Sequence, residues 1–497
     1  MQIKEKIEKS VEENKEQLIQ YCRRLIDIPS VTGNEGAVQQ EVSRIMTEIG
    51  MDIDMWEPDD REMRESSLFS ETGESFNGRP VVVGGLHGTG GGKSLLVNGH
   101  VDVVNEYPRE KWDSDPFHSV IRNGRIYGRG ASDMKSGVAM ALFAAKIIRD
   151  MGIVLKGDFT IVSVPGEENG GNGTVASVLR GYTDFDAAIY PEPTSNQIQP
   201  AHRGAAFWRV YIEGKASHGG TKYQGVSAVE KGMKIARALE ELEWKRHREI
   251  CSKHPMYGDY PLSAPVTLGI FRGGQFTSGV PETCILEGCI EYVPGEASRD
   301  VCKSLEGAVW EACRGDEWLL THKPRVEWFG LRYEPSETDP HHPFVKTAEG
   351  CYREMLGRDP EINGFEAGTD MRVLANNFGV PGIMFGPGDI AMAHAPNEYV
   401  EIGKLVEAAK VLLLLITEWC GWRRKRREYK KCVRMKAVAN VWGKNAGNCA
   451  RFRDQNRPGS KRTFSSMKAA GLIGGRRLTE KRGYRYLNGS LACGSGM

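Results

Sequence analysis

The sequence predicts an α/β protein of two domains, in which a smaller α+β domain is inserted into the chain of a larger α/β domain. In the first 200 residues, short apolar runs with the length of buried strands alternate with segments whose apolar residues recur at helical spacing. Beyond residue 203, strand-like segments alternate polar and apolar side chains, and the first pattern resumes near residue 326. The length of 497 residues leaves room for two to four domains.

The larger predicted domain comprises residues 1–202 and 326–420. Helices are expected between residues 3 and 49 and over residues 138–149, where apolar residues recur at helical spacing. Buried strands are expected at the apolar runs 94–98, 159–164 and 186–190. This alternation predicts a sheet with helices on its faces.

The inserted domain is predicted to span residues 203–325. Its expected strands are residues 207–212, 266–271 and 284–292, and its expected helices are residues 226–242 and 298–314. Two helices on antiparallel strands would make a compact α+β unit.

The net charge of +1 hides an uneven distribution of charge. Residues 421–497 contain 21 Lys and Arg residues but 3 Asp and Glu residues, whereas residues 1–420 carry a net charge of −17. Clustered basic residues could bind a polyanion such as nucleic acid. Because this tail has neither apolar periodicity nor a repeat, we expect a disordered or non-native extension that does not bind nucleic acid.

Composition also predicts the location of the protein. The eleven cysteines lack close-paired metal or redox spacings, and residues 1–17 lack the apolar core of a secretory signal. The apolar run 411–416 is far shorter than the roughly 20 residues of a membrane span. We therefore expect a cytoplasmic protein without a membrane partner.

Several predicted strands are followed by side chains that bind metals. The candidates are His100, Asp102, Asp133, Glu167, Glu168, Glu192 and His394. Sites in open α/β sheets form beyond the carboxyl ends of the strands, so these segments could converge. Because His100 and Asp102 are two residues apart on an extended segment, both side chains would face the same way, and Asp102 could orient the His100 ring.

Each of these signals is weak alone. A single histidine is more often a surface or hydrogen-bonded residue, and adjacent glutamates are commonly solvated. Two histidines together with several carboxylates after apolar strands instead fit two cations bridged by a shared carboxylate. Zn²⁺ suits this mixture of ligands best, and Co²⁺ or Mn²⁺ could substitute.

Six motifs in order resemble a known family. They are HVDVV, WDSDPF followed by NGRIYGRGASDMKSG, GEENGGNG, EPT, GKASHGG and AHAPNEYV. Between about residue 15 and residue 420, the chain resembles the acetylornithine deacetylase, succinyl-diaminopimelate desuccinylase and aminoacylase family of dinuclear zinc hydrolases, metallopeptidase family twenty.

The resemblance implies a ligand for each metal position. Asp133 would bridge two Zn²⁺ ions, His100 and Glu192 would complete one site, and Glu168 and His394 would complete the other. Among the remaining candidates, Glu167 would be the general base, because a nearby carboxylate can take a proton from water that attacks an amide. Asp102 would orient His100.

Two further residues are expected to contact the substrate. His218, in KASHGG, is by itself a turn histidine, but the resemblance implies that it stabilises the oxyanion from the inserted domain, typically across a homodimer. That domain would then be a lid and dimerisation domain. Arg372, in GFEAGTDMR, is either a clamp for a substrate carboxylate or a partner in a structural ion pair.

The resemblance implies hydrolysis of the amide bond of a small molecule. We expect removal of an acyl group from an N-acyl amino acid or related amide, as in acetylornithine deacetylase, and a dipeptidase or carboxypeptidase is the alternative. Thr277 and Ser278 occupy a loop where many relatives carry an Asn, which argues against the well-known substrates. A catalytically silent protein and a nucleic-acid-binding protein are rivals, and the complete set of ligands and base argues against the first.

Overall fold

The large sheet of the protein contains nine strands in the order β1-β2-β7-β3-β8-β18-β9-β16, with β17 paired to β9. The computed structural model describes residues 3–424, apart from the side chain of Leu331, so nearly all of the basic tail lies outside the described residues. The strands are β1 (Asp52–Trp56), β2 (Val81–Leu86), β3 (Leu95–His100), β7 (Phe159–Val164), β8 (Ala188–Tyr190), β9 (Ile198–His202), β16 (Ser336–Glu337), β17 (Ile362–Phe365) and β18 (Gly382–Met384). In its centre, β7, β3, β8 and β18 run parallel.

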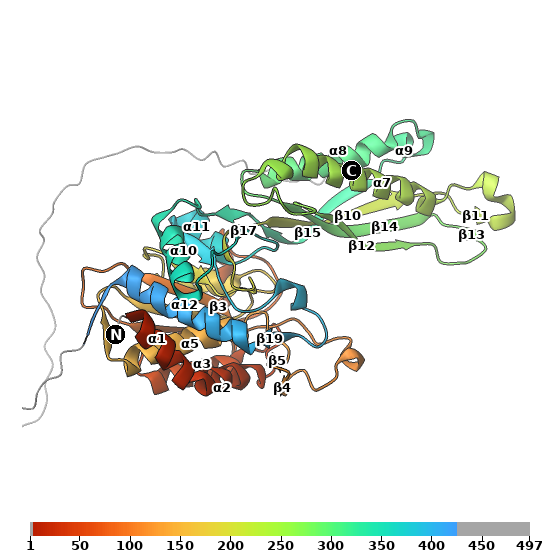
Figure 1. The fold of residues 1–497 in the computed structure, drawn as a ribbon. Coiled ribbons are helices and arrows are strands. Elements are labelled where there is room, and N and C mark those ends of the chain that lie inside the picture. The colour runs from red at the N-terminus through yellow and green to blue at the C-terminus, as the bar shows by residue number, and fades with distance from the viewer. Residues whose placement is uncertain (1–2, 425–497) are drawn as a thin grey trace, which may run out of the picture. The chain divides into compact units, whose positions relative to one another are not determined.

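Helices cover both faces of this sheet (Figure 1). One layer contains α1 (Ile3–Glu13), α2 (Lys15–Ile26), α3 (Gly36–Ile49), α5 (Lys135–Asp150), α10 (Pro343–Leu356) and α12 (Ile402–Cys420). The other contains α4 (Asp60–Glu65), α6 (Asn172–Leu179) and α11 (Met371–Phe378). Leu95 and Val97 of β3 pack in the first core and Leu96 packs in the second. Both faces are buried because side chains alternate along a strand, which explains why the central strands read as continuous apolar runs.

A second sheet is antiparallel, with the order β12-β14-β10-β15. Its strands are β10 (Gly204–Glu213), β12 (Val266–Gly273), β14 (Thr283–Tyr292) and β15 (Arg325–Tyr333), and its helices are α7 (Ala228–Glu249), α8 (Ser298–Cys313) and α9 (Glu317–Thr321). Residues on β10 alternate between buried and half-buried, as the sequence pattern predicts. The α/β fold with an inserted α+β segment is therefore confirmed.

Strand pairing differs from the predicted boundaries in two places. The predicted end of the inserted domain at residue 325 falls in β15, which pairs with β10 as far as Tyr333. At the start of the basic tail, β20 (Trp422–Arg424) pairs with β6 (Ile153–Leu155). Backbone hydrogen bonds hold β20 in place, which an arginine-rich composition does not reveal. The division into domains itself stays a prediction.

Short pairings complete the described chain. They are β4 (Val120–Arg122) with β5 (Arg125–Tyr127), β5 with β19 (Tyr399–Glu401), and β11 (Ser217–His218) with β13 (Gly279–Val280). Within residues 3–424, no helix combines the length and the hydropathy that a membrane span requires.

Candidate metal centre

The candidate ligands lie beyond the carboxyl ends of the central parallel strands. His100 is the last residue of β3, and Glu168 lies in the loop between β7 and α6. Glu192 follows β8, and Asp133 precedes α5 by two residues. Because β3, β7 and β8 are parallel, their carboxyl ends meet at one edge of the sheet, where open α/β folds form their sites.

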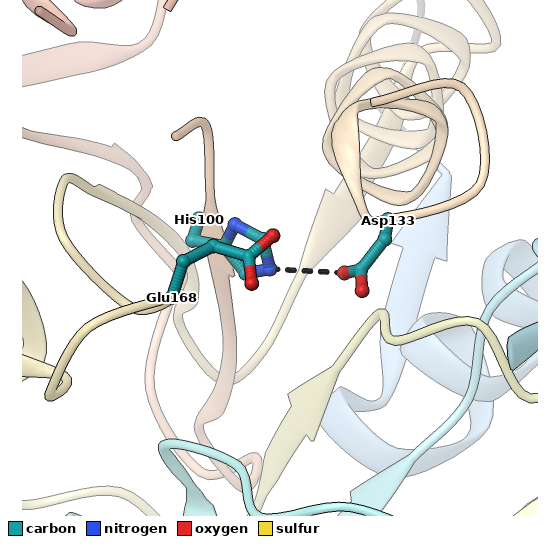
Figure 2. Close-up of side chains that lie close together, drawn as sticks. All are labelled: His100, Asp133 and Glu168. Carbon is teal, nitrogen blue, oxygen red and sulfur yellow. Dashed lines mark hydrogen bonds and ion pairs between the residues drawn. The ribbon is translucent and has the colours of Figure 1, made fainter. Parts of the chain in front are cut away.

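Three of these side chains form a compact cluster of possible ligands. One ligand atom each of His100, Asp133 and Glu168 lies within 4.8 Å of the other two. Nε2 of His100 is 3.1 Å from Oδ1 of Asp133, and the Glu168 carboxylate lies beside that contact (Figure 2). This spacing is typical of side chains that share a metal centre.

His394 joins the same cluster from the loop between β18 and β19. Its Nε2 is 3.0 Å from Oε2 of Glu168 and 3.6 Å from Oδ2 of Asp133. Asp133 therefore lies between His100 and His394, where a bridging carboxylate would have to lie. The buried Glu192 is close enough for the charge of Asp133 to act on it.

The His100 ring is oriented by a backbone group. Nδ1 lies 2.9 Å from the carbonyl oxygen of Asp102. Because a carbonyl oxygen only accepts hydrogen bonds, Nδ1 carries a proton, and the ring is held with Nε2 toward the Asp133 carboxylate. The Asp102 carboxylate, which we expected to orient the ring, also faces it, with Oδ1 3.5 Å from Nδ1.

The same carboxylate organises the loop that carries the two glutamates. Its Oδ1 accepts a hydrogen bond from the backbone N–H of Glu167, and its Oδ2 accepts one from the N–H of Glu168. The hydroxyl of Thr32 donates a third hydrogen bond to Oδ2. No spacing in the sequence predicts these contacts.

Negative charge is concentrated and buried in this region. Burial raises the pKa of Glu168 above its usual range, and the nearby charge of Asp133 raises it further. The same two causes raise the pKa of Glu192 well above its usual range. The hydrogen bond to Glu168 raises the pKa of His394 to about 9. For Asp133, burial acts to raise the pKa, but the hydrogen bond and charge of His100 outweigh it and lower the pKa. Buried carboxylates of this density need compensating positive charge, and imidazole with carboxylate ligands suits Zn²⁺, Co²⁺ or Mn²⁺, so the residues fit a metal centre.

Glu167 lies next to this cluster and is 9% exposed. Burial, and next the charge of Asp370, raise its pKa well above the usual range. Its backbone carbonyl accepts a hydrogen bond from the hydroxyl of Tyr333, the last residue of β15. A carboxylate with a raised pKa is suited to take up a proton near neutral pH. Sequence reasoning missed Tyr333, because a tyrosine at the end of a strand carries no motif.

The structure gives the two predicted substrate contacts different surroundings. The guanidinium of Arg372 lies 4.4 Å from the centre of the Tyr333 ring and donates to the carbonyl oxygen of Gly170. In the described part of the chain no carboxylate oxygen lies within ion-pair distance of it, although its charge acts to lower the pKa of Asp370, so both interpretations of Arg372 stay predictions. His218 is exposed on β11, where Nδ1 accepts from the N–H of Gly220, and no contact joins it to the metal cluster within residues 3–424.

Fold and site together define a metal-dependent hydrolase that acts on amide bonds. Residues 96–418 match Peptidase family M20/M25/M40, and the chain belongs to this family. This agrees with the resemblance found in the sequence motifs.

Individual relatives have several activities. The chain is 34% identical over 438 residues to N-formyl-4-amino-5-aminomethyl-2-methylpyrimidine deformylase of Bacillus subtilis, an alignment that covers 84% of this chain and 97% of the relative. It is 30% identical to acetylornithine deacetylase of Myxococcus xanthus, with 69% and 84% covered. A tripeptidase structure from Staphylococcus aureus has a TM-score of 0.63 at 21% identity, covering 82% of this chain and 99% of that one. That last likeness shows the shared fold.

Proposed function

We propose that the protein hydrolyses the amide bond of a small N-acyl amine, with a formyl group as the preferred acyl group. One observation carries the reaction type: the compact cluster of His100, Asp133 and Glu168 beside the buried carboxylate of Glu167. The acyl group is inferred from the likeness to the Bacillus subtilis deformylase, which extends over nearly all of that enzyme.

Five side chains would hold two Zn²⁺ ions, with Asp133 shared between them. His100 and Glu192 would serve one ion, and Glu168 and His394 would serve the other. Two such ions lower the pKa of water and polarise an amide carbonyl. Co²⁺ or Mn²⁺ would be accepted by the same oxygen and nitrogen ligands.

Glu167 would move the proton in this reaction. It would take a proton from the attacking water and later return it to the nitrogen of the leaving amine, which balances the hydrolysis. Asp102 would keep Glu167 in place through the hydrogen bond to its backbone N–H. Arg372 would bind a polar group of the substrate beside Tyr333.

His218 would complete the site by stabilising the oxyanion of the tetrahedral intermediate. Because no contact joins His218 to the cluster in the described chain, the proposal requires a movement of the inserted segment or a second copy of the chain. A homodimer is the assembly we expect, in the cytoplasm, without a nucleic-acid partner for the tail.

Removal of an acetyl or similar acyl group from an amino acid is the second candidate. The likeness to the Myxococcus xanthus acetylornithine deacetylase favours it. A dipeptidase or carboxypeptidase on the same fold is the remaining alternative.

A matched panel of amides tests the proposal. Release of amine by the Co²⁺-loaded protein would be measured with the N-formyl and N-acetyl derivatives of an aminomethylpyrimidine and of several amino acids, and with dipeptides. We expect the N-formyl aminomethylpyrimidine to have the highest kcat/KM, at least about tenfold above its acetyl analogue, because one methyl group in a fitted pocket changes selectivity by about that much. Faster turnover of N-acetyl amino acids would select the second candidate, and turnover of dipeptides alone would contradict both.

A further inference from the structure

A buried ion pair links the two loops that carry Asp133 and His394. Arg129 and Glu398 are each 1% exposed, and Nη1 of Arg129 lies 2.6 Å from Oε2 of Glu398. Arg129 precedes Asp133 by four residues, and Glu398 follows His394 by four residues. Neither residue belongs to the predicted ligands or to the predicted catalytic groups.

Glu398 holds the backbone on which Asp133 is mounted. Its second carboxylate oxygen, Oε1, accepts hydrogen bonds from the N–H of Ser132 at 2.7 Å and from the N–H of Asp133 at 3.1 Å. A buried carboxylate that accepts two backbone N–H groups and one guanidinium is held firmly by charge-assisted hydrogen bonds. The position of Asp133 is therefore tied to the segment that follows His394.

Arg129, the other member of the ion pair, holds the backbone at His394. Nη2 donates to the carbonyl oxygen of His394 and Nη1 donates to that of Ala395, both at 3.4 Å, while Nη2 also donates to the carbonyl oxygen of Asn105. The backbone of His394 has a φ of 61°, a left-handed conformation that is uncommon for residues other than glycine. Such a conformation persists where the surroundings fix it, and these contacts help to do so.

Apart from its contacts with Glu168 and Asp133, the His394 side chain is largely open to solvent. It is 52% exposed, whereas the side chain of Asp133 is 11% exposed and that of His100 is 2% exposed. An exposed ligand on a loop loses more conformational freedom when it binds an ion, unless its backbone is already held in place.

We propose that the Arg129–Glu398 pair is a clamp that fixes the separation of Asp133 and His394, so that the ion bound through His394 finds a preformed site. This inference rests on the proposed metal centre. Arg129 and Glu398 act through the ligands, so they are positioning residues. The ion served by His394 and Glu168 depends on the clamp, and the ion served by His100 and Glu192 depends on it less.

The test is a titration of metal-free protein with Co²⁺. Calorimetry measures the affinity for each ion, and visible absorption reports the coordination of the ion. The variants are Arg129→Lys, which keeps the charge but loses the guanidinium fork, and Glu398→Gln, which keeps the shape but loses the charge. Arg246→Lys is the matched control. Arg246, in the last turn of α7, forms a buried ion pair with Glu296 outside the metal cluster. The thermal unfolding of each variant is measured with and without Co²⁺.

The wild type should bind two ions, and each clamp variant should bind one of them about 10- to 100-fold more weakly, which is the usual effect of removing a group that orients a ligand. Arg246→Lys should bind both ions as the wild type does, even if its melting temperature falls. The two clamp variants remove different features of the ion pair. If one of them does not fold, the metal affinity of the other decides the outcome.

Unchanged affinity for both ions in a folded clamp variant would overturn the clamp while leaving the metal centre intact. The pairing of β5 with β19, which lie next to these two residues in the chain, would then suffice to hold the loops together. Equal weakening in Arg246→Lys would also overturn it, since general loss of stability would explain the result. A wild type that binds no Co²⁺ would overturn the proposed metal centre and the clamp with it.

Discussion

Asp102 is a fully buried carboxylate that serves two segments of the site at once. Its backbone carbonyl accepts from Nδ1 of His100, while its side chain accepts from the backbone N–H groups of Glu167 and Glu168. One residue thus aligns a proposed ligand of the metal and the proposed general base. We expect its side chain to affect the base more than the metal, because the backbone carbonyl makes the shorter contact with His100, at 2.9 Å against 3.5 Å for the carboxylate.

Replacing Asp102 with asparagine tests this assignment. The amide nitrogen of the substituted side chain would face one of the two backbone N–H groups and could not accept from it, so the loop that carries Glu167 should shift. We expect kcat to fall about 10- to 100-fold while the bound metal stays near the wild-type amount. Thr32→Val is the control, because it removes only the third hydrogen bond to the same carboxylate. A wild-type kcat in a folded Asp102→Asn variant would contradict the role.

His202 is a buried histidine whose protonation state follows from its contacts. Nδ1 lies 2.9 Å from the carbonyl oxygen of Arg203, and Nε2 has no hydrogen-bond partner within residues 3–424. Burial lowers the pKa of His202 to about 3. The folded protein therefore keeps this ring neutral at pH values where an unfolded chain, with a pKa of about 6.5, would protonate it.

The pH dependence of stability should reflect this residue. Since the unfolded chain takes up a proton that the folded protein does not, the stability contributed by neutral His202 is present above a pH of about 6.5 and is lost as the pH falls toward about 3. His202→Asn keeps a donor for the Arg203 carbonyl but does not titrate, so its melting temperature should fall less between about pH 7 and about pH 4.5. Parallel acid transitions of the variant and the wild type would refute a neutral buried His202.

The packing of β10 against β14 requires a glycine at residue 288. Trp208 on β10 is fully buried and lies opposite Gly288 on β14. A Cβ atom at Gly288 would lie 2.5 Å from Cζ2 of Trp208 and 1.9 Å from the carbonyl oxygen of Thr267 on β12. The indole occupies the space that a side chain would need, and the adjacent strand closes the remaining gap.

Gly288→Ala should therefore destabilise the inserted segment. We expect a loss of about 1–3 kcal/mol, the usual cost of overpacking a core, with part of it due to displacement of the β12 backbone. Urea unfolding followed by tryptophan fluorescence measures it. Gly307→Ala on α8 is a suitable control, because nothing lies within 4 Å of a Cβ atom there. A Gly288→Ala variant as stable as the control would contradict the packing described.

The elements differ in how far the sequence predicts them. The strands at residues 159–164 and 284–292 and the helix over residues 138–149 were predictable, because burial on one or both faces imposes a pattern on the residues. The helix α4 and the antiparallel orientation of β1 and β2 were not, since a short exposed helix and antiparallel pairing leave no such pattern. The two-domain pattern also missed the extension of β15 to Tyr333.

For the whole molecule, the proposed centre depends on residues that lie far apart in the chain. His100, Asp133 and Glu168 are brought together by the carboxyl ends of parallel strands, whereas His394 comes from a loop more than 200 residues later. Motifs revealed the ligands because each carries a distinctive residue type. The motifs contain Arg129 and Glu398 but not Tyr333, and they do not reveal what any of the three does, because those roles depend on contacts across the fold.

Metal-dependent amide hydrolysis through Glu167 is the central claim for the whole molecule. The most direct measurement is amine release from the best N-acyl substrate by the wild type and by Glu167→Gln, with the bound metal quantified in both. We predict two bound ions in each protein and a kcat about 10²- to 10⁴-fold lower in the variant, because only the proton acceptor is lost. Equal turnover by the two proteins, or wild-type turnover that persists after the metal is removed, would contradict the claim.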